Sequence, residues 1–220
     1  MKGWGGMIAK WKSLAAAQRW MLVVLAIAVA LAQINQPYPL VAPLHHTPTV
    51  ILLLASPYLL TRWPLSNEAV GCIVAFFLLH TLAGRYTYTM TPYDDWAKAL
   101  TGQGINALFG WERNNFDRLV HFTFGLMAIL PAYEILTRYL GVGHRFAIYI
   151  GLEFVMGISA VYELFEWGLA EVVAGEAAAQ YNGQQGDVWD AQKDMALALV
   201  GALITSGVLM WRRYRGRALA

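Results

Sequence analysis

The sequence lacks most of the signatures that would assign it to a common soluble class. It has one cysteine, Cys72, so neither a disulfide framework nor a cysteine-based zinc site can form. Only 14% of its 220 residues are charged and the net charge is +2, which implies no basic nucleic-acid-binding face. Phosphate-binding loops, nucleophile elbows, HExxH helices and haem-attachment motifs are also absent from the sequence, which excludes the enzyme classes that they mark.

The chain is instead rich in apolar residues. Hydrophobic residues make up 58% of it and the mean hydropathy is +0.44, which is too apolar for a soluble domain. Tryptophan and tyrosine, with 9 and 11 copies, suit aromatic belts at the two membrane interfaces. The composition therefore predicts an all-α protein of the lipid bilayer, because the apolar runs have the length of membrane helices.

We expect one integral membrane domain over residues 1–220, built as a polytopic bundle of about six transmembrane helices. Each expected span is near the ~20 residues that cross a bilayer. The expected spans are 14–34, 48–62, 68–86, 117–138, 145–169 and 190–211. The second has a short apolar core that contains Pro57, so it could instead be re-entrant.

Basic residues predict the orientation of this bundle. With six crossings and a cytoplasmic N-terminus, most of the 16 basic residues lie on the cytoplasmic side. The exceptions are Arg85, Lys98, Arg113, Arg118 and Lys193. The positive-inside rule then places both termini in the cytoplasm of a bacterium, in a multi-pass protein of the inner membrane. Long outer loops at 87–116 and 170–189 indicate that the protein works on the periplasmic side.

Ionisable side chains interrupt the apolar spans near their outer ends. Such groups are expensive in a bilayer and therefore indicate a functional site. Asp117 and His121 are four residues apart, so they share a helix face, although Asp117 could also complement the helix N-terminus. Glu163 and Glu166 are three apart, and paired carboxylates repel unless they share a proton or a cation. Glu166 could alternatively be solvated at the interface.

The last span begins with three aspartates on one face. Asp187, Asp190 and Asp194 follow the i, i+3, i+7 spacing of a helical stripe. The first two could cap the helix, whereas Asp194 lies deeper and is followed by apolar residues. The third span adds His80 at a comparable depth. Four helices can thus direct polar groups to one outward-open pocket.

Carboxylates with imidazole suit a divalent metal ion such as Zn²⁺, Mn²⁺ or Fe²⁺. The expected metal ligands are His80, His121, Glu163, Glu166, Asp187 and Asp194. Asp117 or Asp190 would act as a general base in catalysis. Arg113 and Arg118 would bind a substrate phosphate or neutralise spare carboxylates.

These same residues carry a family resemblance. The strings Phe116-Asp117-Arg118-Leu-Val-His121, Tyr162-Glu163-Leu-Phe-Glu166-Trp and Gly183-Gln-Gln-Gly186-Asp187-Val-Trp-Asp190-Ala-Gln-Lys-Asp194 resemble the YjdF-type bacterial inner-membrane proteins, a family of unknown function. More distantly, the Asp-x-x-x-His pattern and the Gly-Asp-x-x-Asp string are similar to VanZ-like proteins. That family typically has Asn where this chain has Asp194, so the present site is more acidic. The resemblance implies a six-helix inner-membrane protein and supplies no reaction.

Three functions remain open from the sequence. The first is a metal-dependent enzyme, a hydrolase or transferase that acts on a lipid headgroup or envelope precursor at the periplasmic side. The second is a cation- or proton-coupled transporter, whose relay would need polar groups such as Glu134 and Glu153 toward the cytoplasm. The third is a structural protein in which the polar cluster locks helices together.

Overall fold

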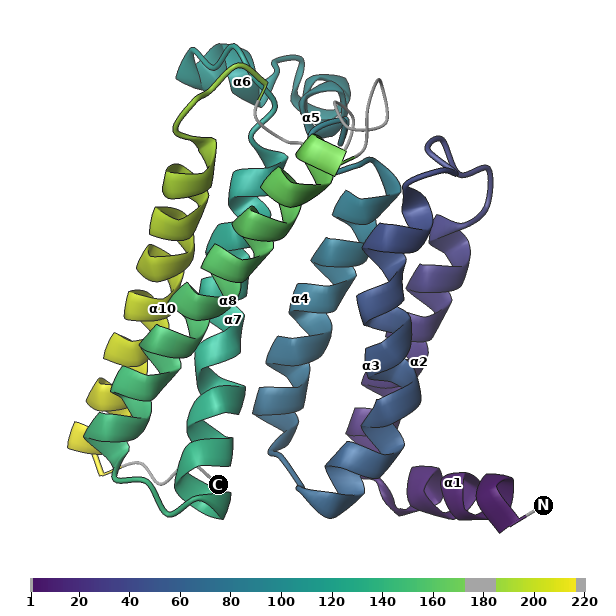
Figure 1. Ribbon diagram of the computed structural model, residues 1–220, viewed down its shortest axis with the longest axis vertical. Coiled ribbons are helices and arrows are strands. Elements are labelled where there is room, and N and C mark those ends of the chain that lie inside the picture. The colour runs from purple at the N-terminus through teal and green to yellow at the C-terminus, as the bar shows by residue number, and fades with distance from the viewer. Residues whose placement is uncertain (1, 173–184, 217–220) are drawn as a thin grey trace.

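The computed structural model describes residues 2–172 and 185–216, and every regular element among them is an α-helix. The elements are α1 (Lys2–Ser13), α2 (Ala16–Ala32), α3 (Ala42–Arg62), α4 (Asn67–Arg85), α5 (Tyr93–Thr101), α6 (Ile105–Phe109), α7 (Phe116–Tyr139), α8 (His144–Val172) and α10 (Asp190–Tyr214). The long helices α2, α3, α4, α7, α8 and α10 run side by side, and α1 lies across one end of the bundle (Figure 1).

Not all of the six expected spans meet the same criterion for crossing a membrane. By length and hydropathy, α4, α7, α8 and α10 qualify among the described residues. Residues Gly6–Ser13 and Ala16–Ala32 form a pair bent by 116°, which gives a fifth span if the pair counts as one. Helix α3 does not qualify, because His45, His46 and two prolines dilute its apolar character. That α2 and α3 each cross the membrane, which six crossings require, therefore remains a prediction.

The end of the bundle that carries α1 is fixed by a polar contact between α4 and α7. Ser66 caps α4 by accepting the backbone N–H of Ala69. The Glu134 carboxylate of α7 accepts hydrogen bonds from both the Ser66 N–H and the Ser66 hydroxyl. It also pairs with Arg138 at 3.4 Å, as the i, i+4 spacing predicts. This network joins the start of one helix to the end of another.

Helices α7 and α10 make the closest contact in the bundle. A Cβ atom at Gly125 would lie 1.8 Å from the Ala198 carbonyl oxygen, and one at Gly201 would lie 2.2 Å from the Phe122 carbonyl oxygen. The two backbones can approach this closely only because these positions lack side chains. The contact matters for the site because Gly125 follows His121 by one turn and Ala198 follows Asp194 by one turn.

The opposite end of the bundle is covered by the short helices α5 and α6 and their loops (Figure 1). Asn114 anchors this cover to the start of α7. Its side-chain amide donates to the Thr91 carbonyl, and its backbone N–H donates to the Gln185 side chain. The Tyr93 hydroxyl accepts the N–H of Asn115. The loops before α7 and α10 are thereby held together at the level where the acidic residues begin.

Candidate metal centre

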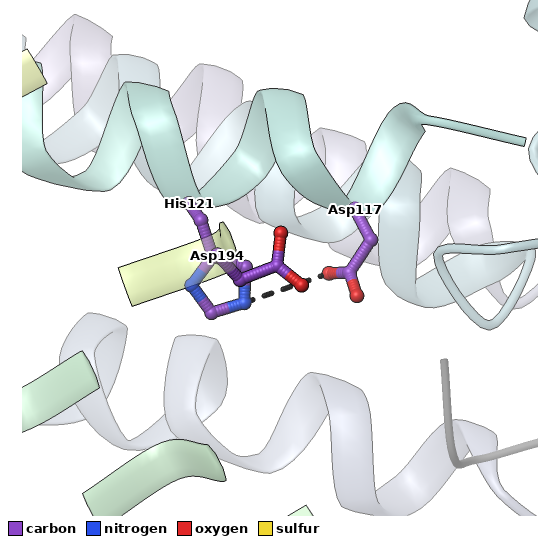
Figure 2. A group of neighbouring side chains, drawn as sticks. All are labelled: Asp117, His121 and Asp194. Carbon is purple, nitrogen blue, oxygen red and sulfur yellow. Dashed lines mark ion pairs between the residues drawn. The ribbon is translucent and has the colours of Figure 1, made fainter. Parts of the chain in front are cut away.

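Asp117, His121 and Asp194 form one buried group between α7 and α10. Each offers a ligand atom, and these atoms all lie within 4.8 Å of one another. Their exposed fractions are only 2%, 6% and 2%. Figure 2 shows Asp117 and His121 projecting from one helix toward Asp194, which approaches from another. This spacing and donor set suit a single divalent cation, so the group could hold a metal ion.

The local sequence explains why these three side chains meet. Asp117 and His121 occupy the first two turns of α7, and their four-residue spacing puts them on one face. Asp194 lies one turn into α10. The backbone contact of Gly125 with Ala198, one turn further along both helices, brings these faces together. The site is therefore built on rigid helices rather than on loops.

The carboxylates of this group have unused acceptor atoms. Oδ1 of Asp117 and Oδ1 of Asp194 are buried and have no hydrogen-bond donor among the described residues. Buried polar atoms nearly always have a partner, because leaving one unpaired costs about 1–3 kcal/mol. Two such oxygens beside an imidazole nitrogen are the feature expected of a site that a cation completes.

Glu163 of α8 lies at the edge of this group. Its Oε1 atom is 3.3 Å from Nε2 of His121, and Oδ1 of Asp117 is 3.7 Å from the same nitrogen. Oε1 of Glu163 nevertheless has no hydrogen-bond donor among the described residues, so the contact with His121 is electrostatic only. Glu163 therefore adds a third carboxylate with a free oxygen.

Glu166 lies close to the group without joining it. Its side chain is buried, which differs from the solvated interface position that the sequence left open. The Tyr162 hydroxyl hydrogen-bonds its carboxylate. The Tyr162 ring stands edge-on to the His121 ring, with centroids 5.7 Å apart. Tyr162 thus links Glu166 to His121, a connection that sequence spacing alone did not reveal.

Two arginines neutralise the aspartates at the mouth of the site. Arg113 binds Asp190 with both terminal nitrogens, at 2.5 and 3.2 Å. Arg118 pairs with Asp187 at 2.6 Å and with Asp190 at 3.3 Å. Of the two roles predicted for these arginines, the geometry shows neutralisation directly. Asp190 is held by two guanidinium groups, which places it among the ion pairs rather than at the buried group.

Asp187 belongs to the same ion-pair network. Lys193 donates to its carboxylate at 2.6 Å, and the Trp189 N–H and Arg118 donate as well. The Lys193 hydrogen bond is the main reason that the pKa of Asp187 falls to about 2. The helix-capping alternative for Asp187 and Asp190 is not seen, because Trp189 is the N-cap of α10 and the helix has no side-chain cap hydrogen bond. The structure does not bring Asp187 to Asp117, His121 and Asp194, and Gly183 of the same loop lies outside the described residues.

His80 is also not brought to the group. Its Nε2 atom contacts the His45 carbonyl oxygen at 2.8 Å, and its Nδ1 atom contacts the Tyr88 hydroxyl at 2.6 Å. Because both ring nitrogens already have partners, His80 has no lone pair to offer a metal ion. The depth of His80 predicts that it shares the pocket. It does line a cavity that His121 also lines, but its ring nitrogens are bonded to His45 of α3 and to Tyr88 in the loop after α4.

Comparisons with known proteins agree with this membrane architecture. Residues 17–215 match the model of a family described as predicted membrane protein, DUF2238. The inner membrane protein YjdF of Escherichia coli (strain K12) is 36% identical over 177 residues, which cover 79% of this chain and 78% of YjdF. No solved structure matches. The predictions of an all-α membrane protein and of an inner-membrane location are confirmed, and the chain belongs to the DUF2238 family of membrane proteins.

Proposed function

We propose that this protein is a metal-dependent enzyme of the inner membrane, with its site open to the periplasm. The observation that carries the proposal is the buried group of Asp117, His121 and Asp194, whose ligand atoms lie within 4.8 Å of one another. Unpaired buried oxygens cost stability, and a bound cation would repay that cost.

The proposed division of roles follows from the contacts. Asp117, His121 and Asp194 would hold the ion, which supplies Lewis-acid chemistry when bound. Glu163, with its free Oε1 next to His121, would accept a proton from the attacking water or hydroxyl group. Tyr162 and Glu166 would position the His121 ring. We therefore place Asp117 among the ligands and assign the base to Glu163 rather than to Asp190.

The mouth of the site suits an anionic substrate. Arg118 uses its terminal nitrogens for Asp187, Asp190 and Asn115, but its buried Nε–H has no acceptor among the described residues. Arg118 also lines a cavity of about 490 Å³ at this end of the bundle. If Arg118 turns its guanidinium group toward this cavity, a phosphate oxygen of a lipid headgroup or envelope precursor would satisfy this donor. The proposed reaction is accordingly hydrolysis or transfer at such a headgroup.

The geometry favours an enzyme over a transporter. Between α7 and α10 a relay is blocked where the backbones touch at Gly125 and Ala198, and the cavities on the other side of α7 are lined by apolar residues beyond His121. The polar residues beyond that level are engaged elsewhere. Glu134 binds Ser66 and Arg138, and Glu153 lies on the exposed face of α8 with a bond to Tyr149. A purely structural lock is disfavoured as well, because a lock would satisfy its own oxygens.

The enzyme proposal is tested by following lipids in vesicles. Purified protein is reconstituted with bacterial polar lipids and Mn²⁺ or Zn²⁺, and mass spectrometry compares the lipids before and after incubation. We expect the wild type to convert a phosphate-bearing lipid, and Asp194→Asn or added chelator to stop the conversion. Asp95→Asn, an exposed carboxylate of α5 outside the site, is the matched control and should stay active. Unchanged lipids with metal-loaded wild type would contradict the proposal.

A further inference from the structure

An apolar groove leads away from the candidate metal centre. One cavity of about 250 Å³ lies next to His121 and Tyr162, and a second of about 430 Å³ follows it along α7. The two share Phe76, Phe77 and Phe124 as lining residues, so they adjoin each other along α7, and we refer to the pair as the groove. Together their volumes are in the range of ligand sites in proteins.

The groove has a defined length and a defined opening. Along α7 it runs from His121 to Leu136, which at 1.5 Å per residue is about 22 Å. Helices α4 and α8 both pack on α7 and form its two sides. Phe154 and Ile158 of α8 line it and yet are 47% and 43% exposed, so its rim faces outward. For a membrane protein, that surrounding medium is hydrocarbon.

The two cavities differ in the residues that line them. The cavity further from the site is lined by apolar side chains with Cys72 as the most polar of them. The cavity at the outer end adds His80, Tyr88, His121 and Tyr162. His121 belongs to both this cavity and the metal group. The groove is therefore apolar along its whole length, as a hydrocarbon chain requires, and it ends beside His121 of the candidate metal group.

The geometry points to a lipid-binding groove in which one hydrocarbon chain of a membrane lipid lies along α7 and its headgroup meets the metal centre. The position of the headgroup rests on the proposed function, whereas the binding of the chain does not. The length supports a lipid chain as the occupant. About 22 Å exceeds half of the ~30 Å hydrocarbon core, so a chain entering from the outer side fits completely.

The test uses a phospholipid with a photoreactive diazirine in one acyl chain, reconstituted with full-length protein in vesicles of phosphatidylethanolamine and phosphatidylglycerol. We expect labelling of the peptides around Phe76 and Met127 in preference to the exposed face of α2. Ala132→Phe would fill the inner cavity that Ala132 lines. Excluding roughly two methylene groups of the chain should lower that labelling about tenfold. Ala128→Phe, one turn nearer the site, should act in the same way.

Ala26→Phe is the matched control, because Ala26 is exposed on α2 and does not line the groove. It should leave the labelling unchanged. Melting curves identify any variant that fails to fold. If one groove variant fails, the labelling of the other groove variant tests the inference. Labelling of α4 and α7 that equals that of α2, or that survives both groove variants, would overturn the inference. A groove occupied by a second copy of the chain, seen as protein–protein cross-links at these peptides, would overturn it too.

Asp194→Asn separates this inference from the proposed function. If the metal centre is as proposed, Asp194→Asn abolishes lipid conversion while the groove peptides are still labelled. Labelling without any conversion by the wild type would leave the groove in place and count against the enzyme. If Ala132→Phe and Ala128→Phe leave lipid conversion unaffected and labelling shows no preference, the enzyme proposal stands and the lipid-binding groove is rejected.

Discussion

His121 and His80 are both buried histidines near the outer ends of their helices, but they face different chemical surroundings. His121 stands among three carboxylates, and its Nε2 atom lies 3.3 Å from Glu163 and 3.7 Å from Asp117. His80 has two neutral oxygen partners, the His45 carbonyl and the Tyr88 hydroxyl. The first arrangement gains from a cation, whereas the second is already complete.

We predict that replacing these two histidines has different effects on the change in melting temperature that a chelator causes. An ion bound only by the folded protein raises its stability by about 2.7 kcal/mol at a hundredfold excess over the dissociation constant. A chelator should therefore lower the melting temperature of the wild type in detergent. His121→Ala should abolish this shift. His80→Ala should keep the shift while lowering the melting temperature overall, because losing its hydrogen bonds costs about 1–3 kcal/mol.

The comparison is read from tryptophan fluorescence during heating, with and without chelator, for the three proteins. An equal chelator effect in wild type and His121→Ala would show that the ion binds elsewhere. A chelator effect that disappears in His80→Ala would show that His80 is a ligand after all, against the hydrogen bonds described above.

These residues also show what the sequence could predict about the site. The four-residue spacing of Asp117 and His121 correctly put both on one face, because helix periodicity is fixed. Counting residues from the helix ends places His80 at the same level as His121. The direction of a side chain around its helix depends on neighbouring helices, and nothing in a single sequence states which helices are neighbours. Depth therefore predicts His80 as a metal ligand, although its ring nitrogens are bonded to His45 of α3 and to Tyr88.

At the scale of elements, the approach of α7 to α10 determines whether the site exists. Gly125 and Gly201 let the two backbones touch, and this contact begins one turn below His121 and Asp194. The pattern of small residues, with Gly125 four after His121 and Ala198 four after Asp194, was available in the sequence as a signal of close helix packing. The expected ranges 117–138 and 190–211 lie within three residues of Phe116–Tyr139 and Asp190–Tyr214, whereas the expected range 48–62 begins six residues inside Ala42–Arg62.

We predict that Gly125→Ala separates the two helices. The added Cβ would lie 1.8 Å from the Ala198 carbonyl oxygen, so the backbones must move apart. Overpacking of this kind should lower the free energy of unfolding by about 3 kcal/mol. Gly207→Ala is the matched control in α10, because no atom lies within 4 Å of its added Cβ. It should change stability by about 1 kcal/mol or less, and in the favourable direction.

Chemical or thermal unfolding in the same detergent measures both variants. The chelator-dependent shift should vanish in Gly125→Ala, since separating the helices also separates Asp194 from His121. Equal stability of the two glycine variants would mean that the close contact does not exist in the folded protein.

At the scale of the whole molecule, both described ends of the chain lie at the same end of the bundle. Helix α1 and the last turn of α10 are at the end opposite α5 and α6 (Figure 1). This agrees with an even number of crossings and with the concentration of basic residues at the two termini. Hydropathy alone does not show whether α3 crosses the membrane, because its histidines and prolines make it less apolar than a typical membrane span.

Topology reporters test this arrangement directly. We expect fusions after residues 90 and 178 to report the periplasm, and fusions after residues 64, 142 and 220 to report the cytoplasm. The physical reason is the asymmetry of lysine and arginine between the two sides. A fusion after residue 36 paired with the one after residue 64 tests whether α3 crosses. A cytoplasmic signal after residue 178 would place the metal centre on the wrong side of the membrane.

The central claim, that Asp117, His121 and Asp194 bind a metal ion, is tested most directly by counting metal in the purified protein. The protein is loaded with Zn²⁺ or Mn²⁺, dialysed, and analysed by inductively coupled plasma mass spectrometry. We expect about one ion per wild-type chain. Asp95→Asn should retain that ion, and Asp194→Asn should lose it. Equal metal content in the wild type and Asp194→Asn, or none in the wild type, would contradict the claim.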